Sequence, residues 1–142
     1  MAQIAYESRT FFVYETDYDA NLAPSDDVTL TFNTHGDSDF FWQKFAMFAL
    51  VDGAATSRSG DQLPAIYMDV TNLTTGRTYQ NTPVPVPNIS WYGGFMDQMV
   101  VWPRKSTVQI FLQNFDIGPM GTTYSKLQLS FLGTKAFPKV RR

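Results

Sequence analysis

The chain has 142 residues, of which 13 are acidic and 11 basic, giving a net charge of −2. Hydrophobic residues make up 44% and aromatic residues 15% of it, whereas charged residues reach only 17%, below the ~25% typical of soluble domains. This composition indicates one folded domain and excludes an intrinsically disordered chain. The absence of cysteine excludes disulfides, thiolate metal sites and cysteine nucleophiles.

We expect residues 1–10 to form an N-terminal arm. The segment lacks the basic stretch followed by an apolar stretch that marks a secretory signal. The longest uninterrupted apolar run in the chain, Phe45–Val51, is far too short to span a bilayer. We therefore expect neither secretion nor a membrane anchor.

The first half of the chain predicts a strand at Phe11–Tyr14, which is dense in apolar residues, and another at Asp26–Asn33, where apolar and polar residues alternate. Phe40–Val51 is denser in apolar residues, and a short amphipathic helix is an alternative to a strand there. Its aromatic content and the turn-forming residues 33–39 before it favour the strand. Apolar and polar residues alternate again in Leu63–Asn72, which predicts a strand with one solvent-exposed face.

The second half continues this pattern. After a glycine-containing loop, Arg77–Gln80 reads as a short hairpin partner of the preceding strand. Three alternating prolines at Pro83, Pro85 and Pro87 exclude a central strand and indicate an extended edge or a connection. Further strands are predicted at Met99–Trp102, Ser106–Phe115 and Tyr124–Gly133.

About eight strands without a convincing helix predict an all-β protein, a two-sheet antiparallel β-sandwich that is jelly-roll-like. We expect this single domain to span residues 11–137, followed by a basic C-terminal tail at 138–142. Residues 1–70 hold 11 acidic and 3 basic residues (net −8), and residues 71–142 hold 2 acidic and 8 basic residues (net +6). The halves either neutralise each other within one fold or give the assembled protein electrostatic polarity.

The residues offer little for catalysis. His35 is the only histidine, and its neighbours predict a surface turn rather than a general base. The carboxylate pairs Asp17/Asp19, Asp26/Asp27 and Asp37/Asp39 do not extend into a calcium-binding loop. No phosphate-binding loop or nucleic-acid-binding motif is present. We therefore expect a protein that is not an enzyme, binds no metal, cofactor or nucleic acid, and acts through protein contacts.

One loop stands out as a candidate contact surface. Residues 88–97 combine two glycines with large apolar side chains, which either plug one end of the sandwich or form an exposed patch of the kind that anchors interfaces. The basic tail is a second candidate. The predicted partner-binding residues are Trp91, Tyr92, Phe95, Met96, Arg141 and Arg142.

The order of these segments resembles the small structural proteins of tailed bacteriophages, in particular jelly-roll cement or decoration proteins of the capsid. In such proteins the final strand ends in a Phe-x-Gly-x-Lys-like pattern, matched here by Phe131, Gly133 and Lys135. The other segments that carry the resemblance are Phe32–Phe41, Val70–Gln80, Asn81–Pro87, Trp102–Phe115 and Leu127–Phe137.

This resemblance implies a virion structural protein, made in the host cytoplasm, which binds the outer capsid surface as a homotrimer and stabilises junctions between major capsid proteins. One alternative is another phage component, such as a head–tail connector, tail or receptor-binding protein. A carbohydrate-binding module is a further alternative, because Trp91 and Tyr92 could stack on sugars.

Overall fold

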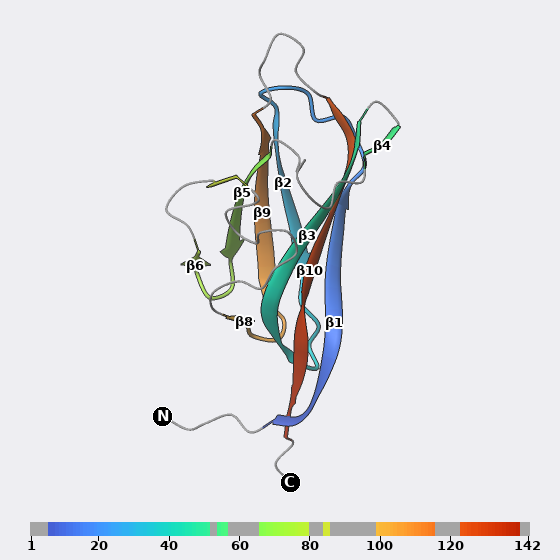
Figure 1. Ribbon diagram of the computed structural model, residues 1–142. Coiled ribbons are helices and arrows are strands. Elements are labelled where there is room, and N and C mark those ends of the chain that lie inside the picture. The colour runs from blue at the N-terminus through green and yellow to red at the C-terminus, as the bar shows by residue number, and fades with distance from the viewer. Residues whose placement is uncertain are drawn as a thin grey trace.

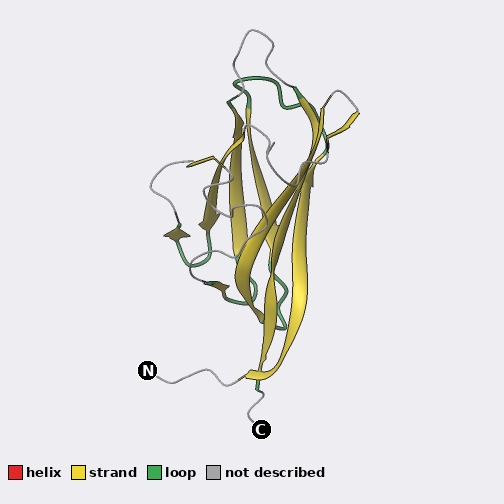
Figure 2. Ribbon diagram, in the orientation of Figure 1, coloured by secondary structure: helices red, strands yellow, loops and turns green. Residues whose placement is uncertain are grey.

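A computed structural model describes residues 6–51, 54–56, 66–79, 84–85, 99–115 and 123–139. All regular elements of this part of the chain are strands, as Figure 2 shows. Ten strands are found there: β1 (Tyr6–Tyr18), β2 (Asp27–Asn33), β3 (Asp39–Val51), β4 (Ala54–Thr56), β5 (Ile66–Asn72), β6 (Arg77–Thr78), β7 (Val84–Pro85), β8 (Val100–Trp102), β9 (Thr107–Asn114) and β10 (Tyr124–Pro138).

The strands form two layers that face each other (Figure 1). Sheet A has the order β1-β10-β3, and the short strands β4 and β8 both pair with β3. Sheet B has the order β2-β9-β5, with β6 and β7 both pairing with β5. Every pairing is antiparallel. The predicted two-sheet antiparallel sandwich is therefore confirmed.

The pairings are nested in sequence, which defines the topology. The first strand pairs with the last, β2 pairs with β9, β3 pairs with β8, and β5 pairs with its neighbours β6 and β7. A long hairpin whose two arms wrap together around one core gives this pattern, and it is the topology of a jelly roll. The jelly-roll prediction is confirmed.

The core lies between the sheets and is rich in aromatic rings. Strands β5 and β9 alternate between fully and partly buried residues, as expected where one sheet face is covered. On sheet A, Trp42 and Trp102 stack with their ring centroids 5.0 Å apart, and both contact the buried Phe131. Such pairs add about 0.5–1.5 kcal/mol each beyond the burial of their area.

The segment Phe40–Val51, for which a short helix was the alternative, forms strand β3, so the predicted strand is confirmed. It pairs with β10 along almost its whole length, with one irregularity between Tyr124 and Lys126 of β10 and a second where Lys44 pairs with Leu132 and Trp42 with Gly133. A Cβ atom added at Gly133 would lie 2.0 Å from the carbonyl oxygen of Phe41. Only glycine therefore lets the two backbones approach this closely.

Several strands differ in length from the sequence-based prediction. Strand β1 begins at Tyr6, within the segment 1–10 that was expected to be an arm, and continues to Tyr18 because it pairs with β10 throughout. Strand β10 continues past Gly133 to Pro138 for the same reason. The proline-rich segment contributes β7, which pairs with the outer side of β5, in agreement with the prediction of an extended edge.

Candidate functional site

The six residues predicted to bind partners lie outside the described part of the chain: Trp91, Tyr92, Phe95, Met96, Arg141 and Arg142. Whether the loop 88–97 forms a plug or a patch stays a prediction. Two other features of the described residues bear on function. One is the loop between β2 and β3, whose end is held by hydrogen bonds and by Lys135, and we call it the loop end. The other is the exposed outer face of sheet A.

The loop between β2 and β3 is held against the turn between β8 and β9. The amide of Thr34 donates to the carbonyl of Ser106 at 2.8 Å, and the Ser106 amide donates back to Thr34 Oγ1 at 2.8 Å. The Lys105 amide donates to the carbonyl of His35 at 3.2 Å. Lys105 has a positive φ of 58°, a conformation that costs a non-glycine residue energy and that these bonds maintain.

A buried lysine ties this loop to the last strand. The Nζ atom of Lys135 lies 2.7 Å from Nδ1 of His35 and 3.6 Å from Oδ1 of Asp37. It also lies 4.1 Å from the centroid of the Phe12 ring, a distance typical of a cation–π contact. The side chain of Lys135 is only 8% exposed, whereas that of Asp37 is 59% exposed. The lysine is therefore satisfied by three partners from two other parts of the chain.

His35 lies at the surface beside the Gly36–Asp37 turn, which confirms its predicted position. Its ring nevertheless packs edge-on against both Phe12 and Tyr14, at 5.3 and 5.2 Å between centroids. The Tyr14 hydroxyl accepts a hydrogen bond from the His35 amide at 2.8 Å. Burial raises the pKa of Tyr14, and the charge of Asp37 raises it further.

A second polar cluster lies nearby at the start of β3. The carboxylate of Asp39 accepts hydrogen bonds from the Tyr6 hydroxyl and the Arg104 amide, both at 3.0 Å. The guanidinium of Arg9 lies over the rings of Tyr6 and Phe41 at 5.5 and 5.3 Å. Burial is the main cause of the raised pKa of Tyr6, with the Asp39 hydrogen bond and charge adding to it.

These clusters connect separate elements of the fold. The carboxylate of Asp37 is engaged by Ser38 and Lys135, and that of Asp39 by Tyr6 and Arg104. Within the described ranges no group of three or more histidine, cysteine or acidic residues could hold a metal ion. Nor does that part of the chain contain a helix long and apolar enough to cross a membrane.

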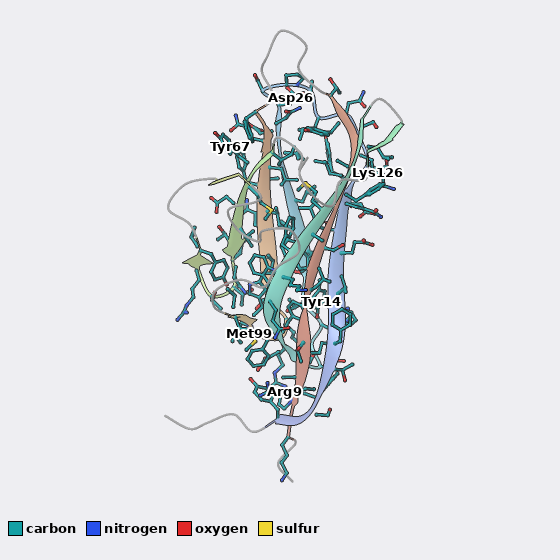
Figure 3. The ribbon with its side chains drawn as sticks, in the orientation of Figure 1. Arg9, Tyr14, Asp26, Tyr67, Met99 and Lys126 are labelled. Atoms are coloured by element: carbon teal, nitrogen blue, oxygen red, sulfur yellow. The ribbon has the colours of Figure 1, made fainter. Side chains whose placement is uncertain are left out.

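The outer face of sheet A carries a row of three apolar residues and one threonine that crosses four strands. The register places Phe11 beside Thr134, Thr134 beside Phe41, and Phe41 beside Val101. We call these four residues the outer row. Phe11 is 67% exposed and Val101 is 46% exposed, so both ends of the row are open to solvent. Figure 3 shows Met99, which is 52% exposed, in the same half of the molecule as Arg9.

The three residues of the Phe-x-Gly-x-Lys-like pattern all lie on the inner side of β10. Phe131 is fully buried, Gly133 leaves room for the backbone of β3, and Lys135 reaches the loop end. The pattern is therefore structural in this chain. The site at Lys135 was missed in the sequence, although a lysine in the inward phase of an alternating strand could have pointed to it.

No protein-family model matches the chain. No curated protein matches it. Among solved structures, it is similar to the crystal structure of the infectious bursal disease virus VP2 subviral particle, with a TM-score of 0.40 and 9% sequence identity. The alignment covers 96% of this chain but 39% of the other, so the chain spans well under half the length of the protein it matches.

Proposed function

We propose that this chain is a non-enzymatic structural protein of a virion, a capsid cement or decoration subunit that binds the junctions between major capsid proteins. The outer row on sheet A is the observation that carries the proposal. A row with Phe11 67% and Val101 46% exposed is a candidate contact area, because a partner that covers it removes apolar surface from water.

The rest of the described structure supports a rigid binding module. The two sheets share a core of stacked aromatic rings, and the loop end is cross-linked through Lys135 and Thr34. A preformed surface binds with a smaller entropic cost than a mobile one. A rigid clip placed across a junction adds buried area to both neighbours without any reaction.

The outer row has a matched control on the opposite side of the molecule. Leu73, at the turn between β5 and β6 of sheet B, is 50% exposed and apolar. Replacing Leu73 by serine removes an exposed apolar side chain without touching sheet A.

The test adds purified protein to capsids that lack it and measures both occupancy and the resistance of the capsids to heat. The proposal expects saturable binding at fixed sites and a higher capsid disruption temperature. The double variant Phe11→Ser/Val101→Ser is expected to lose occupancy, whereas Leu73→Ser keeps it. Absence of saturable binding by the wild-type protein would remove the cement assignment.

A further inference from the structure

Strand β1 is the edge strand of sheet A, and no strand of the described residues pairs with its outer side. It has 13 residues, and of the described strands only β10 pairs with it. Its sequence, Tyr6–Tyr18, contains neither proline nor lysine, although it carries other charged residues and its pairing with β10 is irregular between Tyr6 and Ser8. The regularly paired part of this edge, from Ser8 to Tyr18, can accept another strand whose charges complement its own.

The outward-facing residues of β1 follow a specific order. Tyr14 is buried and Phe12 packs against the core, so the alternate residues face away from sheet B. Along the strand these residues are Arg9, Phe11, Val13, Glu15 and Asp17. The strand thus presents a positive charge, two apolar side chains and two negative charges in sequence.

We propose that β1 pairs antiparallel with β1 of a second copy of this chain, about a two-fold axis at Phe12. Arg9 of each copy then lies opposite Glu15 of the other, and Phe11 lies opposite Val13. Opposite charges and aromatic–β-branched pairs directly across two strands are both stabilising. Because the two-fold axis repeats every contact, the dimer contains two Arg9–Glu15 pairs and two Phe11–Val13 pairs.

The two neighbouring registers pair these residues less well. The pairing must place outward residues opposite outward residues. A shift by one residue would instead place the outward residues of one copy opposite the inward residues of the other. A shift by two residues in one direction sets Arg9 opposite Val13. A shift in the other direction sets Arg9 opposite Asp17 but places Phe11 opposite Glu15. Both leave an apolar side chain against a charge, so the proposed register is favoured.

The pairing joins the two copies of sheet A into one continuous sheet. It uses the β1 edge of both copies, so it closes as a dimer and does not propagate into a fibre. It also brings the two outer rows together, because Phe11 and Val13 of both copies meet at the axis. This inference goes beyond the capsid-binding role, since it requires no partner other than the chain itself.

The mass of the purified full-length chain tests the pairing first. Analytical ultracentrifugation is expected to show a monomer–dimer equilibrium. A chain that stays monomeric at every concentration measured, or one that forms trimers, would overturn the proposal. Failure of the protein to bind capsids would not affect this result, so the two proposals fail separately.

Charge exchange tests the register. Arg9→Glu or Glu15→Arg alone places like charges opposite each other twice, and is expected to weaken the dimer roughly tenfold. The double exchange Arg9→Glu/Glu15→Arg should restore it. The two residues are six positions apart on one strand, about 20 Å, so they cannot restore each other within one copy. Lys126→Glu, on β10, is the matched control and should leave the dimer unchanged.

Cross-linking tests the pairing without relying on charge. The chain has no cysteine, so Phe11→Cys and Val13→Cys each introduce a single thiol. Residues directly opposite in an antiparallel pair lie at a Cα separation of about 4.5–5.5 Å, within the range of a disulfide. A mixture of the two variants should form mainly the mixed cross-linked dimer. Equal yields of mixed and self-linked dimers would contradict the register, even if the mass shows a dimer.

Discussion

The ammonium group of Lys135 lies 2.7 Å from Nδ1 of His35, a residue 100 positions earlier in the chain. The contact joins the last strand of sheet A to the loop that connects the two sheets. The same ammonium group lies 3.6 Å from Oδ1 of Asp37, on the same loop. The loop end is therefore held by a side chain that is itself almost entirely buried.

Replacing Lys135 by methionine should loosen this loop while preserving the fold. Methionine keeps most of the apolar stem but loses the contacts to His35 and Asp37. We expect a loss of about 1.5–3 kcal/mol in the free energy of unfolding, the usual range for a hydrogen bond to a charged group. Amide hydrogen exchange should become faster at Lys105, whose N–H donates to the carbonyl of His35.

Lys126→Met, at a partly exposed position of the same strand, is the control for that measurement. It should leave both stability and exchange nearly unchanged. Unchanged protection of the Lys105 amide in Lys135→Met would show that the loop does not depend on the lysine.

Gly133→Ala should be among the most damaging single substitutions in β10. The new Cβ would lie 2.0 Å from the Phe41 carbonyl oxygen and 2.9 Å from its carbonyl carbon. Since backbone atoms on a paired strand cannot move away independently, we expect a loss of about 1–3 kcal/mol or more, measured by urea unfolding. Gly36→Ala is the comparison, because its added Cβ meets the flexible end of Lys105 instead. Equal losses in the two variants would contradict this account of Gly133.

Acid should weaken the loop end through Asp37. The hydrogen bond from Ser38 lowers the pKa of this carboxyl, and the charge of Lys135 lowers it further. A carboxyl with a lowered folded-state pKa stabilises the protein above its unfolded pKa, and this contribution is lost as the pH falls through the folded value. Asp37→Asn should therefore flatten the stability curve on the acid side, below about pH 4. Parallel stability curves for Asp37→Asn and wild type in this range would show that Asp37 makes no such contribution.

Alkali should act on Tyr14 in the opposite sense. Burial raises the pKa of its phenol, so the folded state favours the protonated form. That contribution is complete below the unfolded pKa, about 10, and is lost as the pH rises through the folded value. In a titration followed by phenolate absorbance, Tyr14→Phe should remove one late-ionising group. Loss of an early-ionising tyrosine instead would contradict the burial of Tyr14.

The sequence predicted the strands well because alternation reports directly on burial. Strand β9, for example, runs from Thr107 to Asn114 inside the predicted Ser106–Phe115. The full length of β1 was missed because the outer residues of an edge strand, such as Arg9 and Glu15, are polar and lie in no apolar pattern. The contact between Lys135 and His35 was missed because the two residues are 100 positions apart in the sequence and only the fold brings them together.

The claim that matters most is that the outer face of sheet A binds the capsid. Electron cryomicroscopy of capsids decorated with the purified protein tests it most directly. The account predicts jelly-roll density at fixed junctions, with the outer row facing the capsid proteins. Density at those junctions with sheet B against the capsid, or capsids without any added density, would contradict it.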